Sequence, residues 1–422
     1  MNVDIQPARL DNSQQAGGRT NRRDGPVFDH LRGPQVYRFV QRAAFYAIAA
    51  VFICAGAASA QNAESIKINE KGFTGSEVCG KCHTKIYTQW KDGMHAQATS
   101  DPIFRASYME AHYKSGGEAV RLCLVCHAPV SRQTKGYNLD VPPTSEGITC
   151  DFCHSVKGVN LSKSDPFVMD IGPVKYGPNK KGDVKQHKVA YSKTITEASF
   201  CASCHEYSKN GVAIMSTYTE WKNGPYADEG KPCQYCHMPE SAGEISNNVT
   251  GERGAKIYSH NPAGGHSLTQ LQKALALKIA KVDRTKDRLT VNVDLTNNGS
   301  GHRVPTGIPT RKLILYCEVK IPGGNVYKEK IIYEKVIFDK NGVELKSDAD
   351  IMLGYGATIA KDNRIYPKET RREKFTFYVP EGKKASVTAW VDYLYTPVLM
   401  QETEMRVEMN RDQAESNPSM MR

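Results

Sequence analysis

The sequence predicts an α-helical, loop-rich domain over residues 61–267, followed by an all-β, immunoglobulin-like sandwich over residues 268–405. Three observations support this order. Ten of the 12 cysteines lie between residues 79 and 236 in one repeated spacing, whereas apolar and polar residues alternate only after about residue 267. An apolar run at residues 43–60 precedes both parts. With 40% hydrophobic and 24% charged residues, the chain is neither disordered nor a membrane protein of many spans.

The N-terminal segment has the features of an export signal. Its apolar run follows Arg38 and Arg42 and ends in Ala58-Ser59-Ala60, a small-x-small sequence typical of signal-peptidase cleavage. We therefore predict that residues 1–60 are a signal peptide and that the mature protein is periplasmic or extracellular. The alternative is an uncleaved N-terminal anchor, because 18 apolar residues are at the short limit for one membrane span. Contact with a membrane is expected only in that case.

The cysteines of the first domain form five Cys-x-x-Cys-His motifs, the attachment signature of c-type haem. Two thiols three positions apart lie on one side of a helical turn, where both can add to the vinyl groups of one porphyrin. The histidine that follows then ligates the iron from the proximal side. We therefore predict five covalently bound haem c groups. The thiols are Cys79, Cys82, Cys123, Cys126, Cys150, Cys153, Cys201, Cys204, Cys233 and Cys236, and the proximal ligands are His83, His127, His154, His205 and His237.

Other cysteine chemistry explains this pattern less well. Zinc ribbons also use Cys-x-x-Cys pairs, but they do not require a histidine after every second cysteine. A disulfide framework would leave the five histidines without a role.

Beyond the proximal set, residues 61–422 contain enough histidines for a second axial ligand on every iron. Two of them lie in the glycine-containing loop at residues 259–266, where the backbone can approach a flat porphyrin closely. His112 lies in a helical segment without such glycines and is the least favoured. The six are His95, His112, His187, His260, His266 and His302.

One segment of the haem region occurs twice. Tyr87-Thr-Gln-Trp-Lys-Asp-Gly-Met-His95-Ala recurs as Tyr218-Thr-Glu-Trp-Lys-Asn-Gly-Pro-Tyr226-Ala, which indicates an internal repeat. The second copy has Tyr226 where the first has His95. We do not expect Tyr226 to bind iron, because Pro225 alters the backbone before it.

Several phrases resemble a known family: Glu146-Gly-Ile-Thr-Cys-Asp-Phe-Cys-His154, Cys236-His-Met-Pro239 and Gly301-His-Arg-Val-Pro-Thr-Gly307. With the order of the motifs, they are similar to secreted multihaem c-type cytochromes of the superfamily that contains the nitrifier tetrahaem cytochrome, hydroxylamine oxidoreductase and pentahaem nitrite reductase. The resemblance covers roughly residues 72–310 and implies stacked haem pairs with mostly bis-His ligation. The distal ligands that it implies are His95, His187, His260, His266 and His302.

The chain also departs from that family. Pentahaem nitrite reductases carry a Cys-x-x-Cys-Lys motif at the catalytic haem, whereas every motif here ends in histidine. A nitrite reductase is therefore disfavoured. Eight-haem oxidoreductases need more motifs than this chain has.

The two domains should differ in what fills them. The stretch from the first to the last motif cysteine has only 158 residues, so we expect the porphyrins to form the core and the haem-free domain not to fold. After residue 267, alternating apolar runs and glycine-containing turns predict a sandwich of about seven strands. Residues 406–422 are polar and should be a flexible tail. If His302 ligates a haem, its loop ties the sandwich to the haem domain or joins a homo-oligomer.

These features predict an exported pentahaem c-type cytochrome that passes electrons along bis-His haems between extracytoplasmic redox partners, either other cytochromes or a quinol or terminal oxidoreductase. We expect an electron carrier without catalytic residues. One alternative is an oxidoreductase acting on a small nitrogen or sulfur compound at an open iron. The other is a haem-stacked filament subunit for extracellular electron transfer. The formal charge of +11 is scattered and no nucleic-acid recognition motif organises it, so no nucleic-acid partner is expected.

Overall fold

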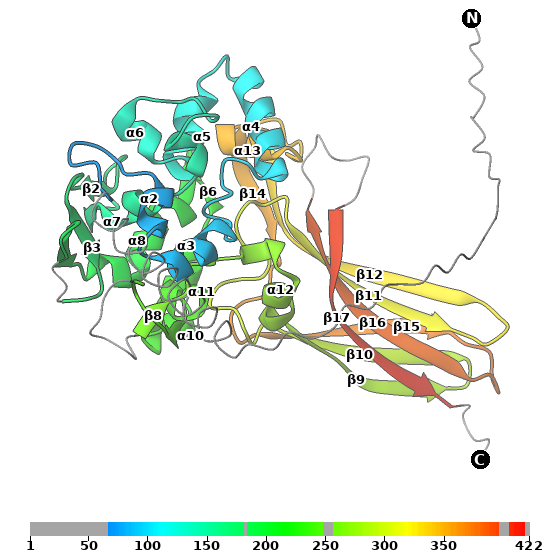
Figure 1. Ribbon diagram of the computed structural model, residues 1–422. Coiled ribbons are helices and arrows are strands. Elements are labelled where there is room, and N and C mark those ends of the chain that lie inside the picture. Colours follow the sequence, from blue (N-terminus) through cyan, green and yellow to red (C-terminus); the bar gives the residue numbers. More distant parts are fainter. Residues whose placement is uncertain (1–65, 181–183, 248–255, 396–404, 418–422) are drawn as a thin grey trace, which may run out of the picture. The chain divides into compact units, whose positions relative to one another are not determined.

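The computed structural model describes residues 66–180, 184–247, 256–395 and 405–417 (Figure 1). Ile66–Arg422 form one compact unit. The predicted signal peptide lies outside the described residues. Within the described ranges, no helix is long and apolar enough to cross a membrane.

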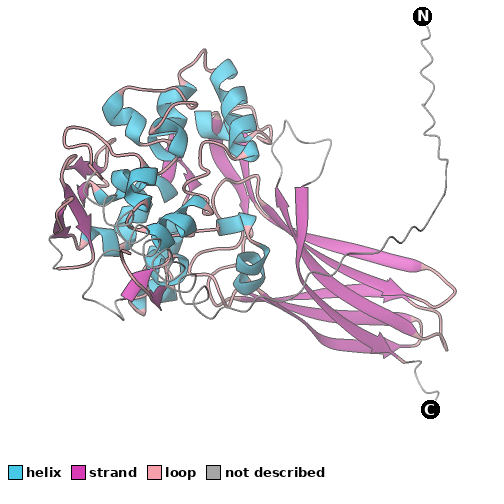
Figure 2. Cartoon of the chain, viewed as in Figure 1, coloured by secondary structure: helices cyan, strands magenta, loops and turns pink. Residues whose placement is uncertain are grey.

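Short helices and loops make up the first part of this unit, as Figure 2 shows. They are short because most of them carry one motif or one capped turn. Thr149, for example, begins a motif helix by accepting a hydrogen bond from the Phe152 amide at 3.0 Å. The helices are α2 (Ser76–Gly80), α3 (Thr84–Lys91), α4 (Pro102–Lys114), α5 (Ala119–His127), α6 (Val130–Thr134), α7 (Cys150–His154), α8 (Ala198–His205), α9 (Thr217–Lys222), α10 (Pro225–Asp228), α11 (Cys233–His237) and α12 (Leu268–Ala274).

Four two-stranded ribbons connect these helices. Three are antiparallel, whereas β3 and β4 pair in parallel. The ribbons bring loops from distant parts of the sequence to the motif helices. They pair β1 (Val156–Val159) with β2 (Phe167–Met169), β3 (Val174–Gly177) with β4 (Lys188–Tyr191), β5 (Tyr207–Lys209) with β6 (Val212–Met215), and β7 (Glu240–Ala242) with β8 (Lys256–Tyr258).

The second part is β-rich and contains two antiparallel sheets with strand orders β15-β10-β9 and β12-β11-β16-β17. Their inward side chains share one cluster of 23 buried residues, so the sheets pack face to face. The predicted alternation is confirmed in β10, where every second residue from Leu289 to Leu295 is fully buried. The strands are β9 (Ala276–Thr285), β10 (Arg288–Thr296), β11 (Lys312–Lys320), β12 (Val326–Tyr333), β15 (Thr370–Tyr378), β16 (Ala385–Tyr395) and β17 (Met405–Ser416).

The prediction of a flexible tail at residues 406–422 is wrong for residues 406–416. Together with Met405, these residues form β17, which pairs with β16 along its length. The strand was hard to recognise because its inward face is only partly apolar. Met409 is buried in the shared core, whereas the inward Asp412 accepts a hydrogen bond from the Ile279 amide at 2.7 Å. A register shift near Val391 also interrupts the alternation.

Residues 335–362 connect the two parts. They form β13 (Lys335–Asp339), α13 (Asp348–Leu353) and β14 (Gly356–Asp362). Ile337 and Ile351 pack with Val212 and Ile214 of β6 in one small cluster. Asp348 at the start of α13 also accepts a hydrogen bond from Ser107 of α4 at 3.3 Å. The β-rich part therefore contacts the helical part through a packed and hydrogen-bonded junction.

Candidate haem sites

The motif histidines are oriented by their own hydrogen bonds. The Nδ1 atoms of His83, His127 and His154 lie 2.6, 2.9 and 2.6 Å from the carbonyl oxygens of Ile245, Ala98 and Tyr176. A carbonyl can only accept, so each Nδ1 carries the proton and each Nε2 keeps a free lone pair. This orientation is the one that metal-binding histidines usually adopt.

Three proximal imidazoles each face a second imidazole from a distant loop. The ring centroids are 6.2 Å apart for His83 and His187, 6.3 Å for His154 and His260, and 6.4 Å for His237 and His302. A metal–imidazole bond of about 2.0 Å on each side, with about 1.1 Å from nitrogen to ring centroid, gives about 6.2 Å between centroids. Each pair therefore has the spacing that one iron between two Nε2 atoms requires.

The facing histidines are oriented by the same kind of hydrogen bond as the proximal ones. The Nδ1 atoms of His187, His260 and His302 lie 3.2, 2.7 and 2.9 Å from the carbonyl oxygens of Lys188, Tyr258 and Arg303. Since these carbonyls lie one or two residues away, the local loop conformation sets the direction of each ring. In five of the six paired imidazoles, a contact of this kind leaves Nε2 as the nitrogen that can bind a metal.

Burial keeps most of these imidazoles neutral, as an iron ligand must be. Desolvation is the largest cause in each case, and neighbouring imidazoles add to it for most of them. It lowers the pKa to about 4 in His95, His127, His237 and His260. The pKa is also lowered in His154, His187, His205 and His302.

The remaining candidates are placed differently. After desolvation, the charge of His205 is the largest contribution to the lowered pKa of His95, so the fourth motif's histidine lies near His95. His127 stacks on Phe104 with ring centroids 3.9 Å apart. His266 faces Tyr395 of β16 at 5.7 Å. The structure thus brings three of the predicted distal ligands, His187, His260 and His302, to proximal histidines and sets His95 near His205, but it does not bring His266 into ring contact with a proximal histidine.

His112 has an unexpected environment. Its Nδ1 atom is buried without a hydrogen-bond partner, and its ring lies 6.0 Å from that of Tyr108. Tyr226, by contrast, donates its hydroxyl to the carbonyl oxygen of Asn298 at 3.0 Å. This bond gives Tyr226 a structural role, in line with the prediction that it does not bind iron.

Thiols of different motifs lie in contact. Close side-chain contacts pair Cys79 with Cys150, Cys126 with Cys204 and Cys201 with Cys233. The thiol charge of Cys153 also raises the pKa of Cys201 and Cys204, so the third motif lies near the fourth. Each contact joins the attachment edges of two sites. The five motifs are therefore linked in one continuous series.

The residues present fit covalently bound haem c. Each motif offers two thiols on one helical turn and an imidazole behind them, and the loops supply further neutral imidazoles. In the described ranges, no group of three or more His, Cys, Asp or Glu side chains could hold a bare metal ion. Sequence reasoning missed the carbonyls of Ile245, Ala98 and Tyr176 that orient the proximal rings, because a backbone acceptor leaves no trace in the residue type.

Known proteins resemble this chain in part of its sequence and in its fold. Residues 78–155 match the cytochrome c554 and c-prime family, which covers less than a fifth of the chain. The structure is similar to the crystal structure of a penta-heme cytochrome c552 from Thermochromatium tepidum, with a TM-score of 0.66 and 22% identity, over 81% of this chain and 99% of that chain. The fold is that of a multihaem c-type cytochrome. No curated protein matches the sequence.

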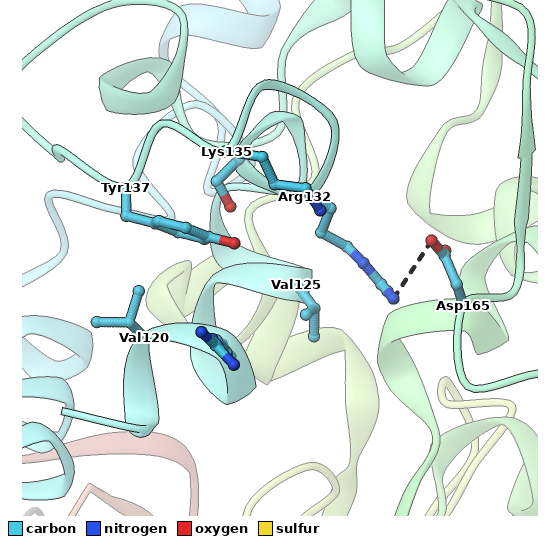
Figure 3. Close-up of a pocket in the computed structure, with 8 residues that line it drawn as sticks. Val120, Val125, Arg132, Lys135, Tyr137 and Asp165 are labelled. Carbon is cyan, nitrogen blue, oxygen red and sulfur yellow. Dashed lines mark ion pairs between the residues drawn. The ribbon is translucent and has the colours of Figure 1, made fainter. Parts of the chain in front are cut away.

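One cavity of about 210 Å³ lies beside the second motif helix, α5 (Figure 3). Arg121 and Val125, which line it, are about half a turn from the face that carries Cys123 and Cys126, so the cavity lies behind that helix. Figure 3 shows Arg132 reaching across it to Asp165, an ion pair of 3.3 Å. The cavity is therefore separate from the haem that these thiols would hold. Its lining is Val120, Arg121, Val125, Ser131, Arg132, Lys135, Tyr137 and Asp165.

Proposed function

We propose that this chain is an exported pentahaem c-type cytochrome that transfers electrons along a series of bis-His haems between extracytoplasmic redox partners. The observation that carries the proposal is the set of three facing imidazole pairs with centroids 6.2 to 6.4 Å apart. The haem iron would supply one-electron chemistry by alternating between its ferric and ferrous states. The chain would hold each iron between two imidazoles that burial keeps neutral.

The contacts between thiols suggest the order of transfer. The first motif contacts the third, the fourth contacts the fifth, and the second contacts the fourth. With the third motif close to the fourth, electrons would pass through the first, third, fourth and fifth sites, and the second would be a branch. Transfer along this series would need no catalytic residue, in keeping with the proposed electron carrier.

The fifth motif is the best candidate for exchange with partners. Cys236 is exposed, whereas the other motif cysteines are at least partly covered, and no residue of α11 is buried. The adjacent Tyr235 is 60% exposed. An exposed attachment edge allows a redox partner, such as another cytochrome or a quinol or terminal oxidoreductase, to approach the porphyrin closely.

The finer structural assignments belong to the same proposal. The strand orders β15-β10-β9 and β12-β11-β16-β17 support an immunoglobulin-like sandwich, because the chain crosses to the other sheet after β10, β12 and β15, as in the variable type of that class. The division at residue 267 is supported by Leu271, the first residue of the β-rich core. The match at residues 78–155 supports membership of the superfamily described above. Since His302 faces His237 of its own chain, the proposal includes no oligomer through that loop.

The haem number and the electron capacity of the purified full chain test this proposal. Intact mass spectrometry should give five haem additions per chain, and a reductive titration should take up five electrons. The His112→Ala variant is the control and should keep both values. Fewer than five haem additions in the mass spectrum, or fewer than five electrons taken up in the titration, would contradict the proposal.

A second function is favoured by the surroundings of His127. Among the described residues, its ring contact is with Phe104 and not with an imidazole, so its iron would have an open position. An open iron could bind a small nitrogen or sulfur compound. Carbon monoxide separates the two functions. One molecule bound per reduced chain would support an open site, whereas no binding by the wild type, with one molecule bound by His266→Ala, would show that His266 closes it.

A further inference from the structure

The repeated segments have the same local structure. The first copy lies on α3 and the second on α9. The rings of Tyr87 and Trp90 are 5.6 Å apart with an interplanar angle of 32°, and those of Tyr218 and Trp221 are 5.7 Å apart at 32°. The sequence repeat is therefore also a repeat in three dimensions.

The two tryptophans hold equivalent points of two motifs. The Nε1 of Trp90 donates to the carbonyl oxygen of Ile148, and that of Trp221 donates to the carbonyl oxygen of Lys231, both at 2.8 Å. Each acceptor lies two residues before the first cysteine of a motif, Cys150 in one case and Cys233 in the other. Each tryptophan thus fixes the start of a later motif helix, α7 in one case and α11 in the other.

The residue before each tryptophan holds the loop that faces that motif. The Oε1 of Gln89 accepts a hydrogen bond from the His260 amide at 3.1 Å. The Oε2 of Glu220 accepts one from the Arg303 amide, next to His302, at 3.2 Å. His260 faces the histidine of the third motif, and His302 faces that of the fifth. Each copy therefore clamps both sides of one site.

The motif before each copy completes the correspondence. The first motif precedes α3, and its Cys79 contacts Cys150. The fourth motif precedes α9, and its Cys201 contacts Cys233. In both copies the first cysteine of the motif before the segment touches the first cysteine of the motif that its tryptophan holds. The haem region thus contains two equivalent two-haem units, and the second motif, on α5, is an addition to the first unit.

The clamps differ in charge, because Gln89 is neutral and Glu220 is a carboxylate. The Glu220 side chain is 5% exposed and forms an ion pair with Arg364 at 2.7 Å. Its Oε2 also accepts a hydrogen bond from Thr306 at 3.0 Å. A negative charge that is shielded from water stabilises the more positive ferric state of a nearby iron more strongly than the ferrous state.

We propose that Glu220 is a positioning residue of the fifth site that also lowers the reduction potential of its haem, and that Gln89 is the neutral counterpart at the third site. The proposal rests on haem binding as proposed above. The difference between the two clamps makes the potentials of two otherwise equivalent sites unequal, which gives electron flow along the series a preferred direction.

Exchanging the two side chains tests this proposal. Glu220→Gln keeps an oxygen that can accept from the Arg303 amide, and Arg364 keeps its bond to Asp362 at 2.8 Å. In a potentiometric titration of the full holoprotein followed by electron paramagnetic resonance, this variant should raise the potential of the fifth haem. We expect a tenfold change in its ratio of oxidised to reduced forms, which is 59 mV for one electron. Gln89→Glu should lower the potential of the third haem.

The control is Glu229→Gln, which removes an exposed carboxylate after α10 and should shift neither potential. The signals are assigned by the loss of one low-spin signal in His302→Ala and of another in His260→Ala. An unchanged or lowered potential of the fifth haem in Glu220→Gln, with its low-spin signal intact, overturns the role of Glu220. If the two alanine variants lose no low-spin signal, the ligand pairs of the proposed function fail instead.

Discussion

The helical and β-rich regions of this chain differ in what fills their interiors. The two sheets share one cluster of 23 buried side chains. In the helical region, the clusters that the described residues form contain only three or four buried side chains each, such as the one around Leu124. Its largest shared features are imidazoles and thiols from distant segments. The β-rich region can therefore be stable as a polypeptide alone, whereas the helical region depends on the groups that its ligands hold.

The helical region can contain very short helices because its cofactors would hold them. A helix of five residues is not stable in isolation, because few of its amides are bonded within it. Here each motif helix would be fixed at three points of one rigid porphyrin. Changes made in either region test this difference between them.

The full chain made without haem attachment should lose the helical region but keep the β-rich one. Limited proteolysis followed by mass spectrometry should digest residues 66–267 and leave a resistant fragment that begins near residue 268, because its core contains no cofactor. Equal resistance of both regions would mean that polypeptide packing alone suffices for the helical part.

A cavity in the shared core should lower the stability of the β-rich region without altering the haems of the folded protein. Phe375 is 2% exposed, so Phe375→Ala should cost about 3–5 kcal/mol in the free energy of unfolding. Tyr378→Ala on the same strand is the control, because Tyr378 is 59% exposed and the change should cost less than about 0.5 kcal/mol. Denaturant unfolding measures both. A changed haem absorption spectrum in the folded Phe375→Ala variant would show that the regions are not independent.

The junction should become more stable in alkali through Lys335. Its Nζ is buried in β13 and donates to the carbonyl oxygens of Ala213 and Ile214, and burial lowers its pKa to about 8. The unfolded chain therefore binds more protons than the folded one from about pH 8 to the ordinary lysine pKa of about 10.4. The free energy of unfolding should rise over that window, by up to about 3 kcal/mol.

The difference between the wild type and Lys335→Met isolates this effect from other groups that titrate in alkali. Denaturant unfolding between pH 7.5 and 10.5 should show the free energy of unfolding of the wild type rising relative to that of the variant. A wild type that loses stability relative to the variant over this range would mean that Lys335 is not desolvated.

The smallest effect is expected at a single cap within the helical region. Thr149→Ala removes the hydroxyl that accepts from the Phe152 amide at the start of α7 and should cost about 1 kcal/mol, with Thr149→Ser as the control. The haem spectrum should stay unchanged, because the cofactor holds the helix. Loss of the haem at Cys150 to His154 would instead show that the polypeptide cap controls this site.

Much of this structure could be predicted from the sequence, because both regions follow strict spacings. The motif spacing located all ten thiols, and the fold, a multihaem cytochrome followed by a β-rich part, is confirmed. The alternating apolar runs after residue 267 also located strands such as β11, where Leu313, Leu315 and Cys317 are fully buried. The distal loops at His260 and His302 also stood out, since glycines surround them.

Other features left weaker signals. Strand β17 was missed because Asp412 occupies an inward position that is usually apolar. The shared clamp role of Gln89 and Glu220 was hidden, although the repeat itself was visible, because it depends on the amides of residues far away in the sequence. The position of His266 beside Tyr395 depends on how β16 packs, which no local pattern reports.

Low-temperature electron paramagnetic resonance of the ferric full chain shows most directly whether the facing histidines bind iron. We expect low-spin signals for the haems of the three facing pairs, and the conversion of one haem to high spin in each of His187→Ala, His260→Ala and His302→Ala. The His112→Ala control should leave the spectrum unchanged. Low-spin signals that persist in all three variants would contradict the account.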